Sequence, residues 1–388
     1  MAKLGDICTI YSGTGFPVQY QGTAEGQYPF YKVGDIAKNV TAGNKYLVFC
    51  ENYVEADIVK IIKGTVLPSR TVVFAKIGEA VKLNRRAITS CECLIDNNAM
   101  GIAPNESVLT LDYFFHYMCS LRLETLAEAT TVPSVKKSLI EKLDIPLPSL
   151  LEQEKISTML NKVSELITLR RDQLAKLDQL VKSRFVELFG DSVTNSMGWD
   201  TDTVIGVCDD IYGGGTPSKS HPEYYENGDI PWVSSKDMKT DVLYDSQIKI
   251  NQLGVDNSTA KMVPINSVIM VIRSGILKHT LPVAVNAVPI TVNQDLKVFI
   301  PSNRILSIFL MHQFKMLEKD ILSGIRAVTA DNIEFDSLKK REIIVPPMEL
   351  QEQFAAFVEQ TDKSKFAIQE SLAELETLKK ALMQKYFG

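Results

Sequence analysis

The residue patterns most often associated with catalysis are missing from this sequence or incomplete in it. The glycine-rich stretch GGGT at 213–216 comes nearest to a phosphate-binding loop, but no Gly-Lys-Ser/Thr follows it. There is no G-x-G-x-x-G dinucleotide fingerprint and no H-E-x-x-H zinc motif. Two of the four dispersed histidines, His116 and His312, fall in helix-like segments, where a packed structural role is simplest. The sequence predicts a non-catalytic chain with no catalytic residues, no metal and no cofactor of its own.

The cysteines do not suggest a metal site or a disulfide framework. Six are scattered along the chain, and none forms a C-x-x-C pair. Cys91 and Cys93 alternate in AITSCECLI, so we expect them to share one face of a strand. No second ligand pair accompanies them, and reduced thiols are the expectation.

Length and composition indicate a multidomain globular protein. The chain has 388 residues, 45% hydrophobic and 23% charged, which is too long for one ordinary core. No apolar run is long enough for a membrane span, and the start has no signal-like segment, so a cytoplasmic location is expected. The net charge of −5 argues against a nucleic-acid binder without excluding one, because basic residues can gather locally.

An internal repeat organises the sequence. At an offset of 198 residues, LPSLLEQEKISTMLNKV (147–163) lies over VPPMELQEQFAAFVEQT (345–361). The register continues without a gap to the Phe-Gly pairs at 189–190 and 387–388. The segments before these helices also correspond, more weakly. The layout is a globular unit, a long helix, a second globular unit and a second long helix.

The globular units have the composition of strand-rich domains. TVVFAKIG, AITSCECLI, SVIMVIRSG and LKVFIP read as short strands punctuated by Gly, Pro and Asn. Amphipathic helices are expected late in each unit, at 111–129 and 304–322. LIDNNAMGIAP (94–104) corresponds to ITVNQDLKVFIP (290–301). The predicted fold class is α+β, with two mixed domains related by a pseudo-twofold repeat.

Each long helix carries one apolar stripe. Upstream prolines and terminal glycines bound helices of about 40 residues, about 60 Å long. Apolar residues spaced by three and four predict a coiled-coil seam, with the two helices packed antiparallel. The predicted seam residues are Ile156, Val163, Leu174, Leu177, Leu180, Phe354, Ile368, Leu372, Leu375 and Leu378.

Several of these motifs resemble a known family, the specificity subunits of type I restriction–modification systems. Residues 148–190 are similar to its central conserved region, and residues 346–388 to its C-terminal one. IYGGGTPSKSHPEYYENGDIPWVSSKDM (211–238) looks like the opening of a target recognition domain. The corresponding first segment, SGTGFPVQYQG, departs from that pattern in being shorter and lacking the Trp. The implied recognition domains are 1–147 and 191–345, each followed by one spacer helix.

The resemblance implies a non-catalytic subunit of a DNA methyltransferase/restriction complex. Each recognition domain would read one half of a bipartite double-stranded DNA target. The helices would set the gap and dock two methyltransferase subunits, which restriction/translocase subunits join. S-adenosylmethionine, ATP and Mg²⁺ would then belong to those partner subunits. Few phosphates would be neutralised by this acidic chain, so weak DNA binding in isolation is expected.

Candidate DNA contacts are basic, hydroxyl and amide side chains on turns beside strands, because these groups contact phosphates and base edges. A solvated turn is the alternative in each case. The candidates in the first unit are Ser12, Thr14, Lys76, Lys82, Asn84, Arg85 and Arg86. Those in the second are Thr216, Ser218, Lys219, Ser234, Ser235, Lys236, Arg273, Ser274 and Lys278. The adjacent Trp232 is expected in the core.

Two other functions remain possible from the residues. A coiled-coil assembly scaffold would have the same helices but would not read DNA. A fused methylating enzyme would need a (D/N/S)-P-P-(Y/F) motif for its target base, and the nearest string, VPPM (345–348), lacks both end residues.

Overall fold

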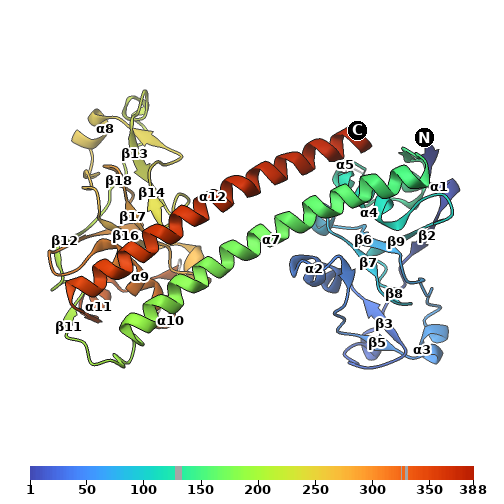
Figure 1. Ribbon diagram of the computed structural model, residues 1–388, viewed down its shortest axis with the longest axis horizontal. Helices are drawn as coiled ribbons and strands as arrows, with labels where there is room; N and C mark the ends of the chain where they lie inside the picture. Colours follow the sequence, from blue (N-terminus) through green and yellow to red (C-terminus); the bar gives the residue numbers. More distant parts are fainter. Residues whose placement is uncertain (127–132, 325, 328–330) are drawn as a thin grey trace. The chain divides into compact units, whose positions relative to one another are not determined.

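The computed structural model describes residues 1–126, 133–324, 326–327 and 331–388. It divides into two compact units, one made of Met1–Gln173 with Ile368–Gly388 and the other of Leu174–Ala367. The two long helices, α7 (Leu150–Phe189) and α12 (Met348–Phe387), each contribute to both units (Figure 1). Among the described helices, none combines the length and the apolar character needed to cross a membrane.

The first unit contains a five-stranded sheet in the order β2-β9-β6-β7-β4 and a three-stranded sheet in the order β5-β3-β8. The strands of the larger sheet are β2 (Cys8–Ser12), β9 (Ala99–Pro104), β6 (Val72–Ala75), β7 (Arg86–Thr89) and β4 (Tyr46–Leu47). Those of the smaller sheet are β5 (Tyr53–Val54), β3 (Tyr28–Tyr31) and β8 (Leu94–Ile95), and β1 (Ala2–Lys3) pairs with β10 (Asp144–Ile145). The helices are α1 (Leu4–Ile7), α2 (Val33–Thr41), α3 (Ala56–Ile61), α4 (Leu111–Ser120), α5 (Leu123–Leu126) and α6 (Lys137–Glu141).

The second unit repeats this topology, with sheets ordered β12-β19-β16-β17-β14 and β15-β13-β18. Its larger sheet consists of β12 (Cys208–Gly213), β19 (Leu296–Pro301), β16 (Val268–Val271), β17 (Val283–Asn286) and β14 (Val242–Leu243). The smaller sheets comprise β15 (Lys249–Ile250), β13 (Ile230–Val233), β18 (Thr291–Val292), β11 (Thr201–Thr203), β22 (Glu342–Ile344), β20 (Arg326–Ala327) and β21 (Asp331–Asn332). The helices are α8 (Gln252–Asp256), α9 (Ser307–Met316), α10 (Glu318–Ser323) and α11 (Phe335–Lys339). The predicted α+β class and internal repeat are confirmed.

The core of each unit lies between the larger sheet and one helix. The central strands β6 and β16 are buried along their whole length, as expected of strands covered on both faces. Tyr113 and Phe114 of α4 pack on the first sheet, and Phe309 and Phe314 of α9 pack on the second. The predicted helices at 111–129 and 304–322 are each divided into two short ones, and residues 127–129 lie outside the described residues.

Within each unit, the start of one long helix packs beside the end of the other. In the first unit, Ile156 of α7 shares a core with Leu382 and Phe387 of α12. In the second, Phe185 near the end of α7 contacts Phe354 near the start of α12, with ring centroids 5.3 Å apart. The helix segments are therefore antiparallel within each unit, as predicted from the repeat.

The buried stripe of the helices differs in part from the predicted seam. Ile156, Val163 and Phe354 are buried, whereas Leu180 and Leu378 keep 48% and 47% of their surface exposed. A helix has 3.6 residues per turn, so leucines spaced by three residues do not stay on one face. The third leucine of each series therefore faces away from the other long helix. The remaining seam residues Leu174, Leu177, Ile368, Leu372 and Leu375 are half-buried.

Two cysteines are placed differently from the expectation. The chain bends between β7 and β8 instead of running as one strand. As a result Cys93 is buried and Cys91 exposed, so they do not share a strand face.

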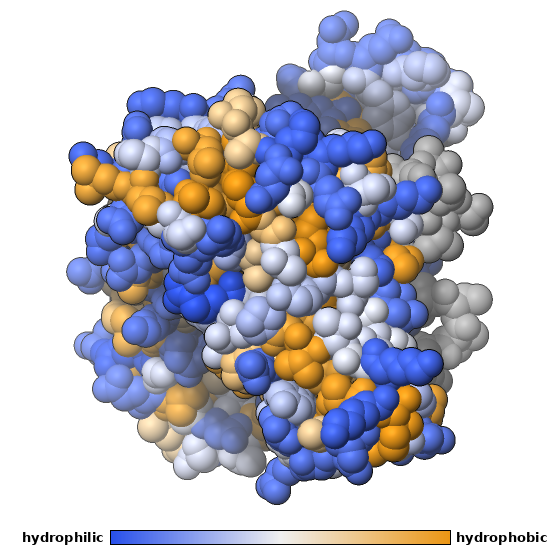
Figure 2. Space-filling view, turned by 90° about the vertical axis from the view of Figure 1, so that its right-hand side faces the viewer, coloured by the Kyte–Doolittle hydropathy of each residue, from blue (hydrophilic) through white to orange (hydrophobic). Residues whose placement is uncertain are grey.

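On the face of the molecule seen in Figure 2, hydrophobic residues form separate patches among hydrophilic ones.

Candidate nucleic-acid interface

Three strand ends of the first unit converge on the turn Asp96–Asn98. The Thr14 N–H, just after β2, donates to the Ile95 carbonyl over 2.9 Å. The Asp96 N–H donates to the Tyr31 carbonyl at the end of β3, over 3.0 Å. The Lys76 N–H, just after β6, donates to the Asn98 carbonyl over 2.8 Å. Candidate residues far apart in the sequence therefore share one edge of the unit.

The second unit has the same convergence, on the turn Asn293–Asp295. The Gly215 N–H donates to the Val292 carbonyl over 3.0 Å. The Asn293 N–H donates to the Val233 carbonyl over 2.9 Å, and the Arg273 N–H to the Asp295 carbonyl over 3.3 Å. The Ile272 N–H, just after β16, also donates to the Asp295 carbonyl, over 2.9 Å. These contacts make Ile272 the counterpart of Lys76, and the turn 293–295 the counterpart of 96–98.

Glycines allow the close crossing of chains at this edge. A Cβ atom on Gly13 would lie 1.7 Å from the Asp96 carbonyl oxygen, and one on Gly214 would lie 2.1 Å from the Val292 carbonyl oxygen. Neither position tolerates a larger residue, because both neighbouring atoms belong to backbone. The GGGT stretch is thus held against the sheet. Trp232 is buried as expected, and its indole N–H donates to the Gly215 carbonyl over 2.9 Å.

Exposed amide side chains stand at the centre of each convergence. Asn97 and Asn98 are exposed in the first unit, and Gln294 is exposed in the second, where its Oε1 accepts a hydrogen bond from the Thr216 hydroxyl. These residues are missing from the sequence-based candidates. The sequence contains a signal for these residues. LIDNNAMGIAP and ITVNQDLKVFIP correspond in the repeat, and in both segments amide residues come directly after apolar residues typical of a strand.

Three of the seven first-unit candidates, Ser12, Thr14 and Lys76, lie on this edge. Ser12 and Thr14 lie at the end of β2, where the Thr14 hydroxyl accepts from the Thr65 N–H over 3.3 Å. Lys76 is half-buried, and Lys82 is exposed and paired with Glu79 over 2.8 Å. Arg85 is half-buried and lines a cavity described below.

Asn84 and Arg86 have structural roles instead. Asn84 has a φ of 54°, and its amide donates to the Leu121 carbonyl over 2.9 Å and accepts from the Leu123 N–H over 3.2 Å. Arg86 is only 4% exposed, and its guanidinium donates to the Asn84 and Leu121 carbonyls. Burial lowers the pKa of Arg86 to about 10. These contacts fix the chain after α4, and the burial of Arg86 does not suit contact with DNA.

The second-unit candidates divide into exposed cations and local caps. Lys219, Lys236 and Lys278 are exposed. Arg273 is exposed and paired with Asp295 over 2.6 Å. The hydroxyls of the group are mostly engaged locally: Ser234 donates to Asp237 over 2.7 Å, Ser218 bonds Ser220 over 2.6 Å, and Ser274 accepts from the Ile276 N–H. Thr216, Ser218 and Ser235 still reach the surface.

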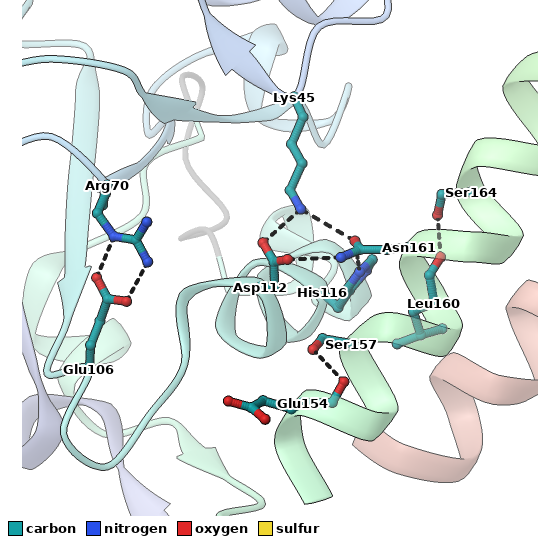
Figure 3. A network of polar contacts seen from close by, with 10 residues as sticks. All are labelled: Lys45, Arg70, Glu106, Asp112, His116, Glu154, Ser157, Leu160, Asn161 and Ser164. Carbon is teal, nitrogen blue, oxygen red and sulfur yellow. Dashed lines mark hydrogen bonds and ion pairs between the residues drawn. The ribbon is translucent and has the colours of Figure 1, made fainter. Parts of the chain in front are cut away.

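A polar network fastens α7 to the first unit (Figure 3). Asp112 of α4 accepts from Lys45 Nζ and from the Asn161 amide, both over 2.8 Å. Asn161 Oδ1 accepts in turn from His116 Nε2 over 2.8 Å. Burial lowers the pKa of His116 to about 4, so the imidazole is neutral at pH 7. The network therefore joins α4 and the segment before β4 to the first half of α7.

The exposed groups of this edge suit the binding of a polyanion. The described residues contain no cluster of three or more His, Cys, Asp or Glu side chains arranged to hold a metal ion. The edge offers amides, hydroxyls and cations on turns that rigid strands position. Such groups can contact a polyanion and read hydrogen-bonding edges.

Comparison with known proteins places this architecture in a family. The model of the type I restriction modification DNA specificity domain matches twice, at residues 1–179 and 197–379. Both matches include one globular domain and most of the long helix that follows it.

Individual relatives agree with the family match. The EcoR124I/EcoR124II specificity subunit of Escherichia coli is 39% identical over 142 residues, which is 37% of this chain and 35% of that protein. The chain thus spans about a third of this relative in the matched region. The MjaIX specificity subunit of Methanocaldococcus jannaschii is 21% identical over 405 aligned positions, covering 99% of this chain and 91% of that protein.

Solved structures share the fold. The S subunit of a type I restriction–modification system from M. genitalium aligns with a TM-score of 0.59 at 15% identity, covering 100% of this chain and 95% of that one. A chain from a study of complex assembly and conformational transition in the type I system aligns with a TM-score of 0.57 at 20% identity, covering 96% of that chain.

Proposed function

The chain belongs to the type I restriction modification DNA specificity family, and we propose that it is a specificity subunit whose two units each read one half of a bipartite DNA target. The observation that carries this proposal is the repeated convergence of three strand ends on one turn. The backbone contacts are the same in both units, while the side chains differ. Equal scaffolds with unequal side chains are what two different half-sites require.

The proposed DNA contacts follow from exposure and chemistry. Asn97, Asn98 and Gln294 offer amides of the type that pair with adenine in the major groove. Lys76, Lys219 and Lys236 offer cations for phosphates. The second set of phosphate contacts comprises Ser12, Thr14, Lys82, Arg85, Thr216, Ser218, Ser235, Arg273 and Lys278. When DNA binds, Arg273 would either leave its ion pair with Asp295 to contact a phosphate, or keep that ion pair and so stabilise the turn.

The long helices are proposed to set the gap between the half-sites. Each is a continuous helix of 40 residues that contributes to both units. Their exposed faces are proposed to dock two methyltransferase subunits, to which restriction/translocase subunits attach. In this proposal the chain performs no chemistry, and S-adenosylmethionine, ATP and Mg²⁺ are bound by the partner subunits. Strong DNA binding would require the assembled complex, because the chain itself is acidic.

The test is a genome-wide map of N6-methyladenine in cells that express the chain with its cognate methyltransferase. A matched strain lacks only this chain. We expect a split motif, two short defined halves around a fixed gap, that disappears with the chain. Identical maps, with the methyltransferase shown to be active, would contradict the proposal and favour a scaffold that does not read DNA.

A further inference from the structure

The first unit contains a cavity of about 780 Å³ beside the start of α7. Its wall combines the segment before β4, the turn that leads into β7, α4, α7 and one residue of α12. Cationic side chains recur in this wall, together with one thiol. They are Lys45, Arg85, Arg86, Lys162 and Lys379, with Cys119 among them.

The positive charges of the wall exceed the negative ones. Lys45 is neutralised by Asp112 over 2.8 Å, and Lys162 by Glu165 over 2.9 Å. Within the described part of the chain, no carboxylate pairs with the buried Arg86, and its Nε has no hydrogen-bond partner. Lys379 is half-buried, and that burial lowers its pKa. Desolvated cations without a counterion are costly, so their field in the cavity favours an anion.

The repeat provides an internal comparison. Arg86 opens β7 opposite Phe74, and its counterpart Val283 opens β17 opposite Met270. Val181 of α7 stands 198 positions before Lys379 and is buried, with 2% exposed. The fold of the repeated unit is therefore formed with apolar residues at both positions.

The cations of the second unit near this place are paired. Lys315 is bound to Asp241 over 2.6 Å, and Lys365 to Asp178 over 2.8 Å. Among the described residues, the excess of positive charge occurs in the first unit and not at the equivalent place in the second, so the shared architecture does not account for it.

We propose that this cavity binds a small phosphate-bearing anion. The half-buried guanidinium of Arg85 and the half-buried ammonium of Lys379 line the same space and suit phosphate oxygens. The apolar Phe115 and Leu83 in the wall accommodate an organic portion. The volume falls in the range of about 300–1,000 Å³ typical of small-molecule sites.

The first test is isothermal titration of the full chain with inorganic pyrophosphate, against chloride of equal ionic strength. We expect one site per chain. Lys379→Met should weaken binding by about tenfold or more, the loss of one charge-assisted contact. Lys380→Met removes an exposed lysine next to it on the same helix and should leave binding unchanged. Circular dichroism would show that both variants are folded.

The second test follows alkylation of Cys119 by peptide mass spectrometry. Pyrophosphate should slow its modification in the parent chain and in Lys380→Met, but not in Lys379→Met. The proposal would be overturned if pyrophosphate bound no more strongly than the ionic-strength control. An equal loss of pyrophosphate affinity in Lys379→Met and Lys380→Met would also overturn it. So would displacement of pyrophosphate by duplex DNA of any sequence, which would assign the cavity to the DNA interface. The methylation map tests DNA reading separately, so the two proposals fail independently.

Discussion

The ring of Phe189 lies edge-on against the ring of Phe309, with centroids 4.8 Å apart. In the first unit the ring of Phe387 packs against the ring of Tyr113, tilted by 58° with centroids 5.1 Å apart. Each long helix therefore ends on the aromatic face of α4 or α9. Gly190 follows with a φ of 73°, and its N–H donates to the Val186 carbonyl over 2.8 Å, which ends the helix. The Phe-Gly pair occurs twice in the sequence because the core of each unit includes the end of one long helix.

Phe189→Ala should destabilise the second unit by about 3–5 kcal/mol, the usual cost of removing a fully buried aromatic ring. Trp199 reports the change directly, since its indole N–H donates to the Phe189 carbonyl over 3.0 Å. Urea unfolding followed by tryptophan fluorescence measures it, because Trp199 and Trp232 both lie in the second unit.

Phe387→Ala is the matched control for this change. Phe387 is only half-buried, so the loss should be smaller and should leave the fluorescence transition of the second unit in place. An equal effect of both changes on that transition would show that the two helix ends are not independent anchors.

Two buried glutamines join the globular domains to the starts of the helices. Gln153 Oε1 accepts from the Thr110 N–H over 2.8 Å, and its Nε2 donates to the Val108 carbonyl over 2.9 Å. Gln351 makes the equivalent contacts, to the Leu306 N–H over 2.8 Å and the Arg304 carbonyl over 3.1 Å. Both side chains are fully buried.

Gln153→Ala should cost about 1–3 kcal/mol for each buried backbone group left without a partner. Glu154→Ala changes the exposed next residue and should be nearly neutral. Differential scanning calorimetry compares the two variants. A Tm for Gln153→Ala within a degree of the Glu154→Ala value would mean that water replaces the amide contacts.

His116 should make the first unit sensitive to mild acid. Its pKa is lowered from the ordinary 6.5 to about 4 by burial, so the unfolded chain binds more protons between these values. The free energy of unfolding therefore has its full value above about pH 6.5. It decreases as the pH approaches 4, by about 3 kcal/mol in total. Denaturant unfolding of the first unit from pH 7.5 to 4 should show this slope.

The His116→Gln variant keeps an N–H donor towards Asn161 without a titrating group, so its slope should be shallower. His221→Gln, which removes an exposed histidine paired with Glu223, should keep the parent slope. Parallel curves for His116→Gln and the parent chain would assign the pH dependence to other groups.

The sequence predicts the repeated organisation well, because helix periodicity and Phe-Gly ends are local signals. It predicts the details of the recognition edge less well. Asn84 and Arg86 have the residue types of DNA contacts, and only the fold shows that both side chains are used by the α4–α5 segment. The amides Asn97 and Gln294 were missed because their importance depends on strand ends that meet across long sequence separations.

Asn97→Ala and Gln294→Ala form a matched pair for base reading, because the two residues occupy equivalent positions in the two turns. Each should relax discrimination at one position by about 1–3 kcal/mol, and the two positions should lie in different halves of the target. Competition binding of the assembled complex to DNA variants measures this. Lys236→Ala should instead weaken binding to all sequences. It should also reduce the slope of log K against log salt concentration by about one, the value of one phosphate contact. Relaxation of the same half by both amide variants would contradict one unit reading one half-site.

The proposed spacer role predicts a change of gap with helix length. Deleting residues 172–175 of α7 and the equivalent 370–373 of α12 removes about one turn, or about 6 Å, from each helix. The deleted positions are exposed or half-buried, so both cores remain intact. With about 3.4 Å per base pair, the gap in the methylation motif should shorten by about two base pairs while both half-sites stay the same. An unchanged gap in a folded, active complex would show that contacts outside the helices set the spacing.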